Sequence, residues 1–201
     1  MKKWHHIKKI SFPFTLVLLL NIAGTSESRA QDPAVYYIAG AALATVLPGF
    51  MFDLPQPDSE QAFTKLSASQ FDAVDDENKA YDFSLEFQPG WTWARIKPLV
   101  GVTGNTDGSF YGWLAASHDF HITRHFVINF NIGPAFYIGG DKAKNLGSAG
   151  VLRSGFEVGY RFDNAWRITG SFHHMSHGKL LNPDTNPGTE MIGLNLSVPI
   201  N

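Results

Sequence analysis

Three side chains near the end of the chain have the types and spacing of a nucleophilic triad. His174 and Ser176 stand two residues apart, and Glu190 follows a segment with the turn-forming pair Pro187-Gly188. A serine hydroxyl becomes a competent nucleophile when an imidazole takes its proton, and a carboxylate on the other ring nitrogen holds the imidazole in the required tautomer. These residues therefore predict attack on a carbonyl group, such as that of an ester.

The same three residues need extended strands to bring them together. Residues two apart on a strand share a face and lie roughly 6–7 Å apart, and neighbouring strands are about 4.8 Å apart. His174 and Ser176 continue an even-numbered apolar row, and Glu190 begins a similar row on the next segment. The two apolar rows are Trp166, Ile168 and Phe172, and then Ile192, Leu194 and Leu196. The side chains are within reach of one another if these segments pair.

Alternation of apolar and polar residues dominates the chain from Phe63 onward. It predicts an all-β fold, an eight-stranded antiparallel transmembrane β-barrel of the outer-membrane type, within residues 61–201. The expected strands are 63–74, 79–88, 94–104, 108–119, 124–138, 149–162, 165–176 and 189–200.

A soluble β-sandwich alternates in the same way, but two features favour the barrel. Glu86, Arg153 and Glu157 are ionised residues in the middle of the polar face, as the interior pairing network of a small barrel requires. Aromatic residues gather near strand ends, as in an aromatic girdle, and we assign Trp91, Trp93, Trp113 and Trp166 to it.

The predicted connections fall into two sets. Short turns are expected at 89–90, 120–123 and 163–164, and loops on the opposite end at 75–78, 105–107, 139–146 and 177–188. Three histidines, His118, His121 and His125, lie at or near one short turn, where we expect them to be solvated. The two long loops are typical of the extracellular side of such barrels.

Residues 1–30 have the features of a signal peptide. Four lysines precede an apolar stretch from Phe12 to Ala23, and small residues occupy the −3 and −1 positions of a cleavage site, Ser28 and Ala30. Residues 31–60 are interpreted as an N-terminal extension and linker, because the uncharged stretch from Ala34 to Phe52 contains glycine and proline. A plug, a periplasmic extension or a surface segment fits it better than a second spanning helix.

The charge of the exported chain excludes some partners. The leader holds four lysines, Arg29 and Glu27, which leaves 11 basic and 17 acidic side chains and a net charge of −6. Such a balance argues against a nucleic-acid partner. The chain has no cysteine, so neither disulfides nor thiolate chemistry is available.

His174-x-Ser176 followed by Asn186-Pro187-Gly188-x-Glu190 resembles the signature of the lipid A 3-O-deacylase (PagL-like) family. The likeness extends upstream through Leu146-Gly147-Ser148, Arg153-Ser154-Gly155 and Gly159-Tyr160-Arg161-Phe162. This sequence has His177 where the family commonly has asparagine directly after the serine.

The resemblance implies an outer-membrane serine esterase that removes a (3-hydroxy)acyl chain from the lipid A of lipopolysaccharide. Ser176 would be the nucleophile, His174 the base and Glu190 the orienting acid, on the lipid-facing surface of the barrel. Oxyanion donors would come from Asn186 and the backbone around His177 and Gly178. No metal or cofactor is implied, and a homodimer is compatible with the likeness.

Two alternatives remain open. The chain could be a non-catalytic small outer-membrane barrel of structural or adhesive type, in which Ser176 and Glu190 are ordinary strand-end residues. The group His173, His174 and His177 suggests a zinc site, but a strand sends His173 and His174 to opposite faces, with His173 pointing inside.

Overall fold

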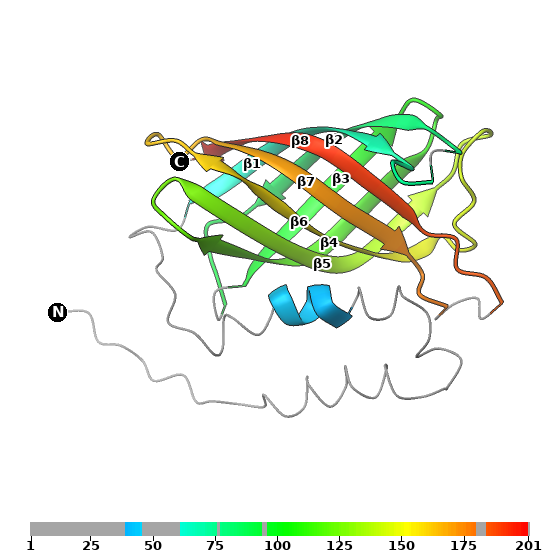
Figure 1. Ribbon diagram of the computed structural model, residues 1–201, viewed down its shortest axis with the longest axis horizontal. Helices are drawn as coiled ribbons and strands as arrows, with labels where there is room; N and C mark the ends of the chain where they lie inside the picture. Colours follow the sequence, from blue (N-terminus) through cyan, green and yellow to red (C-terminus); the bar gives the residue numbers. More distant parts are fainter. Residues whose placement is uncertain (1–38, 46–60, 76, 94–95, 180–183, 201) are drawn as a thin grey trace.

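The computed structural model describes residues 39–45, 61–75, 77–93, 96–179 and 184–200. Eight antiparallel strands, each paired with its neighbours in sequence and the last with the first, form a closed barrel (Figure 1). They are β1 (Ala62–Phe71), β2 (Ala80–Gln88), β3 (Lys97–Asn105), β4 (Phe110–His121), β5 (Phe126–Ile138), β6 (Gly150–Arg161), β7 (Arg167–Ser176) and β8 (Thr189–Ile200). Closure removes the unpaired edges that an open sheet would expose, and the predicted fold class is confirmed.

The strand boundaries differ from the predicted ones by a few residues at several ends. β1 stops at Phe71 because Asp72 takes a left-handed backbone conformation with φ of 55°. β4 continues to His121, two residues beyond its predicted end, and pairs with β5 as far as Val127. The loops β5–β6 and β7–β8 lie at one end of the barrel, called here the long-loop end (Figure 1).

The barrel has an apolar outside and a polar inside, as the alternation predicts. Lys65 pairs with Glu86 at 3.4 Å and with Glu157, and all three side chains are less than a tenth exposed. Arg153 lies over the ring of Trp113 at 4.2 Å and donates to Asn131. Burying these charges is tolerable because each faces a partner of opposite charge or a hydrogen-bonding group.

A second interior network lies toward the short-turn end. Asp119 accepts a hydrogen bond from Arg167 at 2.9 Å and another from Asn129 at 2.8 Å, and Lys97 is 3.5 Å away. Toward the long-loop end the interior is instead filled by apolar side chains. This cluster comprises Phe71, Ala80, Leu99, Tyr111, Trp113, Ala115, Ala135, Tyr137, Leu146, Val151, Met175 and Met191. Side chains fill the inside of a barrel of this size.

Two predicted placements are wrong. His118 is 0% exposed rather than solvated, although its even number places it on the outward row of β4, where Phe120 packs edge-on against its ring at 4.5 Å. Trp113 is 4% exposed and faces the interior, so it does not belong to an outer girdle. Its odd number places it on the same inward row of β4 as Tyr111, and Arg153 covers its ring. Trp91, Trp93 and Trp166 are exposed, as expected.

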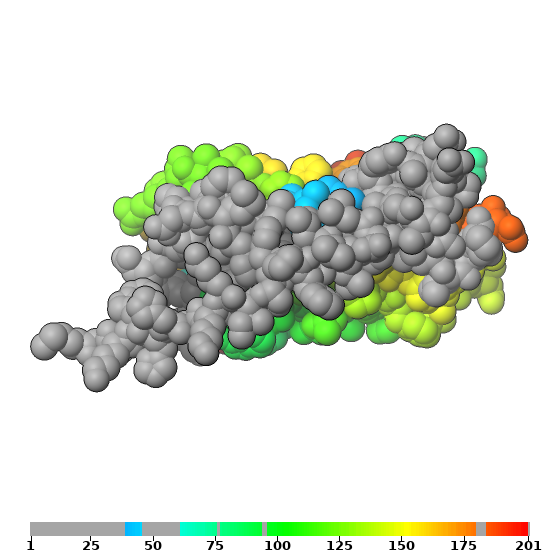
Figure 2. All heavy atoms as spheres, turned by 90° about the horizontal axis from the view of Figure 1, so that it is seen from below, coloured from blue at the N-terminus to red at the C-terminus, as the bar shows by residue number. Residues whose placement is uncertain are grey.

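The predicted leader and most of the predicted extension fall outside the described residues. Within them, residues 39–45 form a short helix, which lies outside the barrel wall and not in its lumen (Figures 1 and 2). In the part of the chain that is described, no helix has both the length and the apolar character needed to cross a membrane.

Candidate functional site

The three predicted triad residues come together at the long-loop end. The register of β7 and β8 places His174 directly opposite Glu190, and Ser176 lies two residues further along β7. His174 Nδ1 is 2.9 Å from Glu190 Oε1, and His174 Nε2 is 3.1 Å from Ser176 Oγ. The imidazole therefore bridges the carboxylate and the hydroxyl, which is the geometry that general-base activation of a serine requires.

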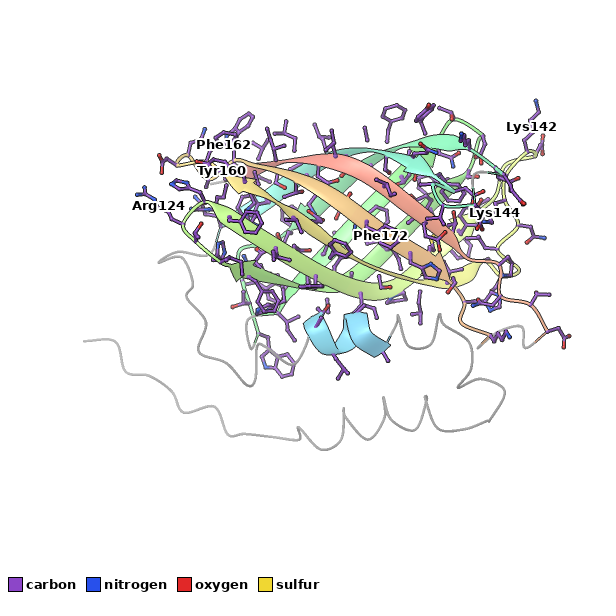
Figure 3. The ribbon with its side chains drawn as sticks, viewed as in Figure 1. Arg124, Lys142, Lys144, Tyr160, Phe162 and Phe172 are labelled. Carbon is purple, nitrogen blue, oxygen red and sulfur yellow. The ribbon has the colours of Figure 1, made fainter. Side chains whose placement is uncertain are left out.

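These residues lie on the outward row of the barrel wall. Phe172, on the same row of β7, projects from the outer surface in Figure 3, whereas Thr169 and His173 are buried inside. On the short-turn side of the site, the outward side chains Ile168, Ile192 and Leu194 are about half exposed or more. A polar row thus interrupts an apolar surface, where polar groups are costly unless they are paired or functional.

The site is more enclosed than the row alone suggests. Ser176 is 0% exposed, and the side chains of His174 and Glu190 are 13% and 20% exposed. Part of the cover is the backbone of Gly188, where an added Cβ would lie 2.7 Å from His174 Cε1 and 3.5 Å from Ser176 Cβ. A glycine is needed here because the loop passes so close to the imidazole. Ser176 thus lies on the outward row of the wall, as predicted, but is covered there.

Two of the predicted oxyanion residues, Asn186 and Gly178, contact each other in the β7–β8 loop that follows Ser176. Asn186 Oδ1 accepts a hydrogen bond of 2.9 Å from the backbone N–H of Gly178. Because an N–H donates only to the amide oxygen, this bond fixes the orientation of the Asn186 amide and directs its NH2 group elsewhere.

His177 lies between two loops. It is 1% exposed, and neither of its ring nitrogens has a hydrogen-bond partner among the described residues. An added Cβ at Gly147 would lie 3.1 Å from His177 Nε2 and 3.5 Å from Pro187, so the β5–β6 and β7–β8 loops meet at this imidazole.

His173 and His174 face opposite sides of the wall, as expected. The His173 ring lies inside the barrel, 3.5 Å from the amide nitrogen of Asn131. Across the described segments of the chain, no three His, Asp or Glu side chains gather in an arrangement that could hold a metal ion.

The long-loop end also carries an ion pair between separate loops. Lys144 in the β5–β6 loop pairs with Asp72 and, at 2.9 Å, with Asp75, both just after β1. Burial alone would raise the pKa of Asp72, but hydrogen bonds from Lys144 and the backbone N–H of Asn78 outweigh it and hold that pKa below its usual value. Lys142 and Lys144 lie at this end, and Arg124, Tyr160 and Phe162 lie at the other (Figure 3).

Sequence reasoning gave no role to one residue of this row, Ser154. Its Cα pairs with that of His174 across β6 and β7, on the side away from Glu190. It lies within the motif Arg153-Ser154-Gly155, and its even number places it in the outward row of Leu152 and Phe156. The signal that found His174, a polar residue in an apolar row, was present here too.

Comparisons with known proteins give the family and the fold of the chain. The family model of lipid A 3-O-deacylase (PagL) matches residues 79–199, more than half of the chain. No curated protein matches the sequence.

Solved structures share the fold. One reported as the outer membrane enzyme PagL is 22% identical, covers 68% of this chain and 99% of its own, and has a TM-score of 0.52. The N-terminal β-barrel domain of Pseudomonas aeruginosa OprF is 12% identical over 71% of this chain and 98% of its own, with a TM-score of 0.51. Its likeness, like that of the PagL structure, concerns the barrel itself. With its family match spanning β2 to β8 and its closed eight-stranded wall, this chain belongs to the lipid A 3-O-deacylase (PagL) family.

Proposed function

We propose that the protein is an outer-membrane serine esterase that releases an ester-linked 3-hydroxyacyl chain from lipid A. The observation that carries the proposal is the Glu190–His174–Ser176 hydrogen-bonded chain on the outward row of the wall. Membership of the deacylase family supports the substrate class. A purely structural barrel would have no need for this chain of polar groups on its apolar surface.

The reaction follows from the protonation states of these groups. Ser176 Oγ attacks the ester carbonyl carbon while His174 Nε2 takes the hydroxyl proton, and the carbonyl π electrons move to the oxygen. Collapse of this intermediate breaks the bond to the sugar oxygen, which receives the proton from His174. Water then attacks the acyl-serine, His174 accepts its proton, and the fatty acid leaves as Ser176 Oγ is reprotonated.

Glu190 acts through the other ring nitrogen. Its Oε1 accepts from Nδ1–H, which presents the unprotonated Nε2 to Ser176 and stabilises the imidazolium once it forms. The negative oxygen of the intermediate needs donors, and the Asn186 NH2 group and the backbone N–H groups of His177 and Gly178 are the candidates. Gly178 donates to Asn186 Oδ1 in this conformation, so it would have to exchange partners to contribute.

The enclosure of Ser176 has a consequence for substrate entry. An ester carbon must approach Oγ to roughly 3–3.5 Å before reaction, yet Ser176 is fully covered and Gly188 packs against the triad. The segment 186–188 must therefore shift when substrate binds. The apolar surface below it, formed in part by Phe172, Ile192 and Leu194, can then contact the acyl chain.

The test is a reaction on purified components. The mature chain, folded in detergent micelles, is incubated with lipopolysaccharide, and both lipid A and free fatty acids are analysed by mass spectrometry. We expect loss of one ester-linked acyl chain and release of the matching hydroxy fatty acid, and no release with Ser176→Ala. Unchanged release by Ser176→Ala would contradict the nucleophile assignment, and intact lipid A in every sample would support the non-catalytic alternative.

A further inference from the structure

Ser154 extends the polar row beyond the triad. Register places Ser154 on β6, His174 on β7 and Glu190 on β8 side by side across the outer wall. The imidazole uses Nδ1 for Glu190 and Nε2 for Ser176. Ser154 therefore stands beside His174 on the side away from Glu190.

The hydroxyl of Ser154 is buried and has no hydrogen-bond partner among the described residues. By contrast, the buried Ser117 in the interior accepts hydrogen bonds from Asn129 and Gln88. A buried hydroxyl without a partner costs roughly 1–3 kcal/mol. Its presence beside a catalytic imidazole is explained if a bound molecule supplies the partner.

The surroundings of Ser154 indicate which part of a substrate would reach it. Leu152 and Phe156 flank it on β6, and Ile132 is its partner on β5. These side chains are apolar and share its outward row, so they suit a hydrocarbon chain better than a phosphorylated sugar. The partner of Ser154 is therefore a polar group on the acyl chain.

The distances specify where on the chain that group must be. Diagonal neighbours on adjacent strands, as Ser154 and Ser176 are, lie about 7–8 Å apart. An ester carbon about 3 Å from Ser176 Oγ carries its third-carbon hydroxyl roughly 3–4 Å further on, from ordinary bond lengths. A hydrogen bond of about 2.8 Å then reaches Ser154, because the path from Ser176 bends at the ester carbon and at the hydroxyl and so covers less than the sum of its parts.

We propose that Ser154 binds the hydroxyl group on the third carbon of the acyl chain and so makes the enzyme selective for 3-hydroxyacyl esters. This inference rests on the proposed esterase function and adds a specificity determinant to it. Ser154 takes no part in proton transfer. It positions the ester by holding the chain one hydrogen bond away from the reacting carbon.

The experiment pairs two substrates with two enzymes. Glucosamine esters carrying either a 3-hydroxyacyl chain or an unsubstituted chain of equal length are presented in mixed micelles to the wild type and to Ser154→Ala. For the wild type we expect kcat/KM to be roughly tenfold higher on the hydroxylated ester than on the unsubstituted one. This is the effect of one hydrogen bond to a buried hydroxyl. Ser154→Ala should lose this preference and match the wild type on the unsubstituted ester.

A matched control separates selectivity from folding. Ser67 also carries a buried hydroxyl without a partner among the described residues, but it faces the interior from β1. Ser67→Ala should keep the wild-type preference. Retention of the preference by Ser154→Ala, or an equal loss on both esters, would overturn the assignment of Ser154 while leaving the esterase intact. A wild type inactive on both esters would overturn the esterase function and this inference with it.

Discussion

Two polar clusters of this barrel use similar residue types in opposite ways. Inside, Lys65 lies between Glu86 and Glu157, and Thr169 donates to the second oxygen of Glu157 at 3.0 Å. On the outer wall, Glu190 contacts an imidazole, and the imidazole contacts a hydroxyl. The inner cluster compensates fixed charges, whereas the outer one connects a carboxylate to a group that can lose its proton.

The difference between the clusters is one of protonation chemistry. A lysine beside two carboxylates stays charged, and the mutual attraction offsets the desolvation of all three groups. An imidazole can accept a proton and return it during a reaction. A carboxylate alone therefore does not distinguish a structural site from a reactive one. Its partner does: a lysine fixes the charge, whereas an imidazole can move a proton.

The largest expected effect separates two adjacent histidines. His174→Ala removes the proton acceptor of the outer cluster and should reduce fatty-acid release about 10³-fold or more. His173→Ala should retain most activity, because its ring is buried inside the barrel near Asn131. Release from lipopolysaccharide in mixed micelles measures both, and comparable losses in the two variants would break the distinction between inner and outer faces.

Replacement of the central cation tests the inner cluster. Lys65→Met leaves Glu86 and Glu157 without their shared counter-ion, and we expect a loss of about 3–5 kcal/mol in the free energy of unfolding. Lys97→Met should cost less, because Asp119 keeps its bond to Arg167. Urea unfolding in micelles, monitored by the heat-modifiable gel mobility, gives the free energy of unfolding of both variants.

The outer carboxylate completes this test. Glu190→Gln should leave stability nearly unchanged, since its side chain is a fifth exposed, but should reduce activity less severely than His174→Ala. If Glu190→Gln destabilised the barrel as much as Lys65→Met, the outer cluster would be structural and the comparison would fail.

The enclosure of the triad predicts an intermediate effect at a glycine. In Gly188→Ala the new methyl group would crowd His174 Cε1, so either the loop or the imidazole must shift. We expect about a tenfold loss of activity with little change in stability, since a small misplacement of a catalytic group is costly. Gly170→Ala is the control on β7, where the nearest atom to an added Cβ, the backbone oxygen of Val158, is 3.9 Å away. Equal activities would show that the loop does not constrain the imidazole.

The barrel and the meeting of the triad could be predicted from sequence because both depend on parity. A strand turns alternate side chains to opposite faces, so His174, Ser176 and Glu190 had to share the outer wall once their segments paired. The same rule placed Glu86, Arg153 and Glu157 inside, where the structure has them.

The features that the sequence did not predict depend on how side chains pack and where loops fold back. His118 was expected to be solvated, but packing against neighbours such as Phe120 buries it, and an alternating pattern does not show such cover. The cover over Ser176 depends on the path of the segment 186–188, which has no periodicity. Ser154 was detectable by parity, but whether its hydroxyl has a partner depends on how neighbouring strands pack, which the sequence pattern does not show.

The smallest expected effect concerns the ion pair between the loops. It resembles the inner cluster in its chemistry but lies outside the barrel interior. Lys144 and Asp72 compensate charge like the inner cluster, but they join two loops at the long-loop end. The pKa of Asp72 is lowered in the folded protein, so its contribution to stability is present above the ordinary carboxyl range and is lost as the pH falls through the folded pKa.

A spin label at Ala149, exposed in the β5–β6 loop, should therefore become more mobile as the pH falls below about 4, the ordinary value for aspartate. Asp72→Asn should give the mobile spectrum at neutral pH with triad activity largely preserved, since the contact lies outside the Glu190–His174–Ser176 chain. A label whose mobility is independent of pH in the wild type would show that this ion pair does not hold the two loops together.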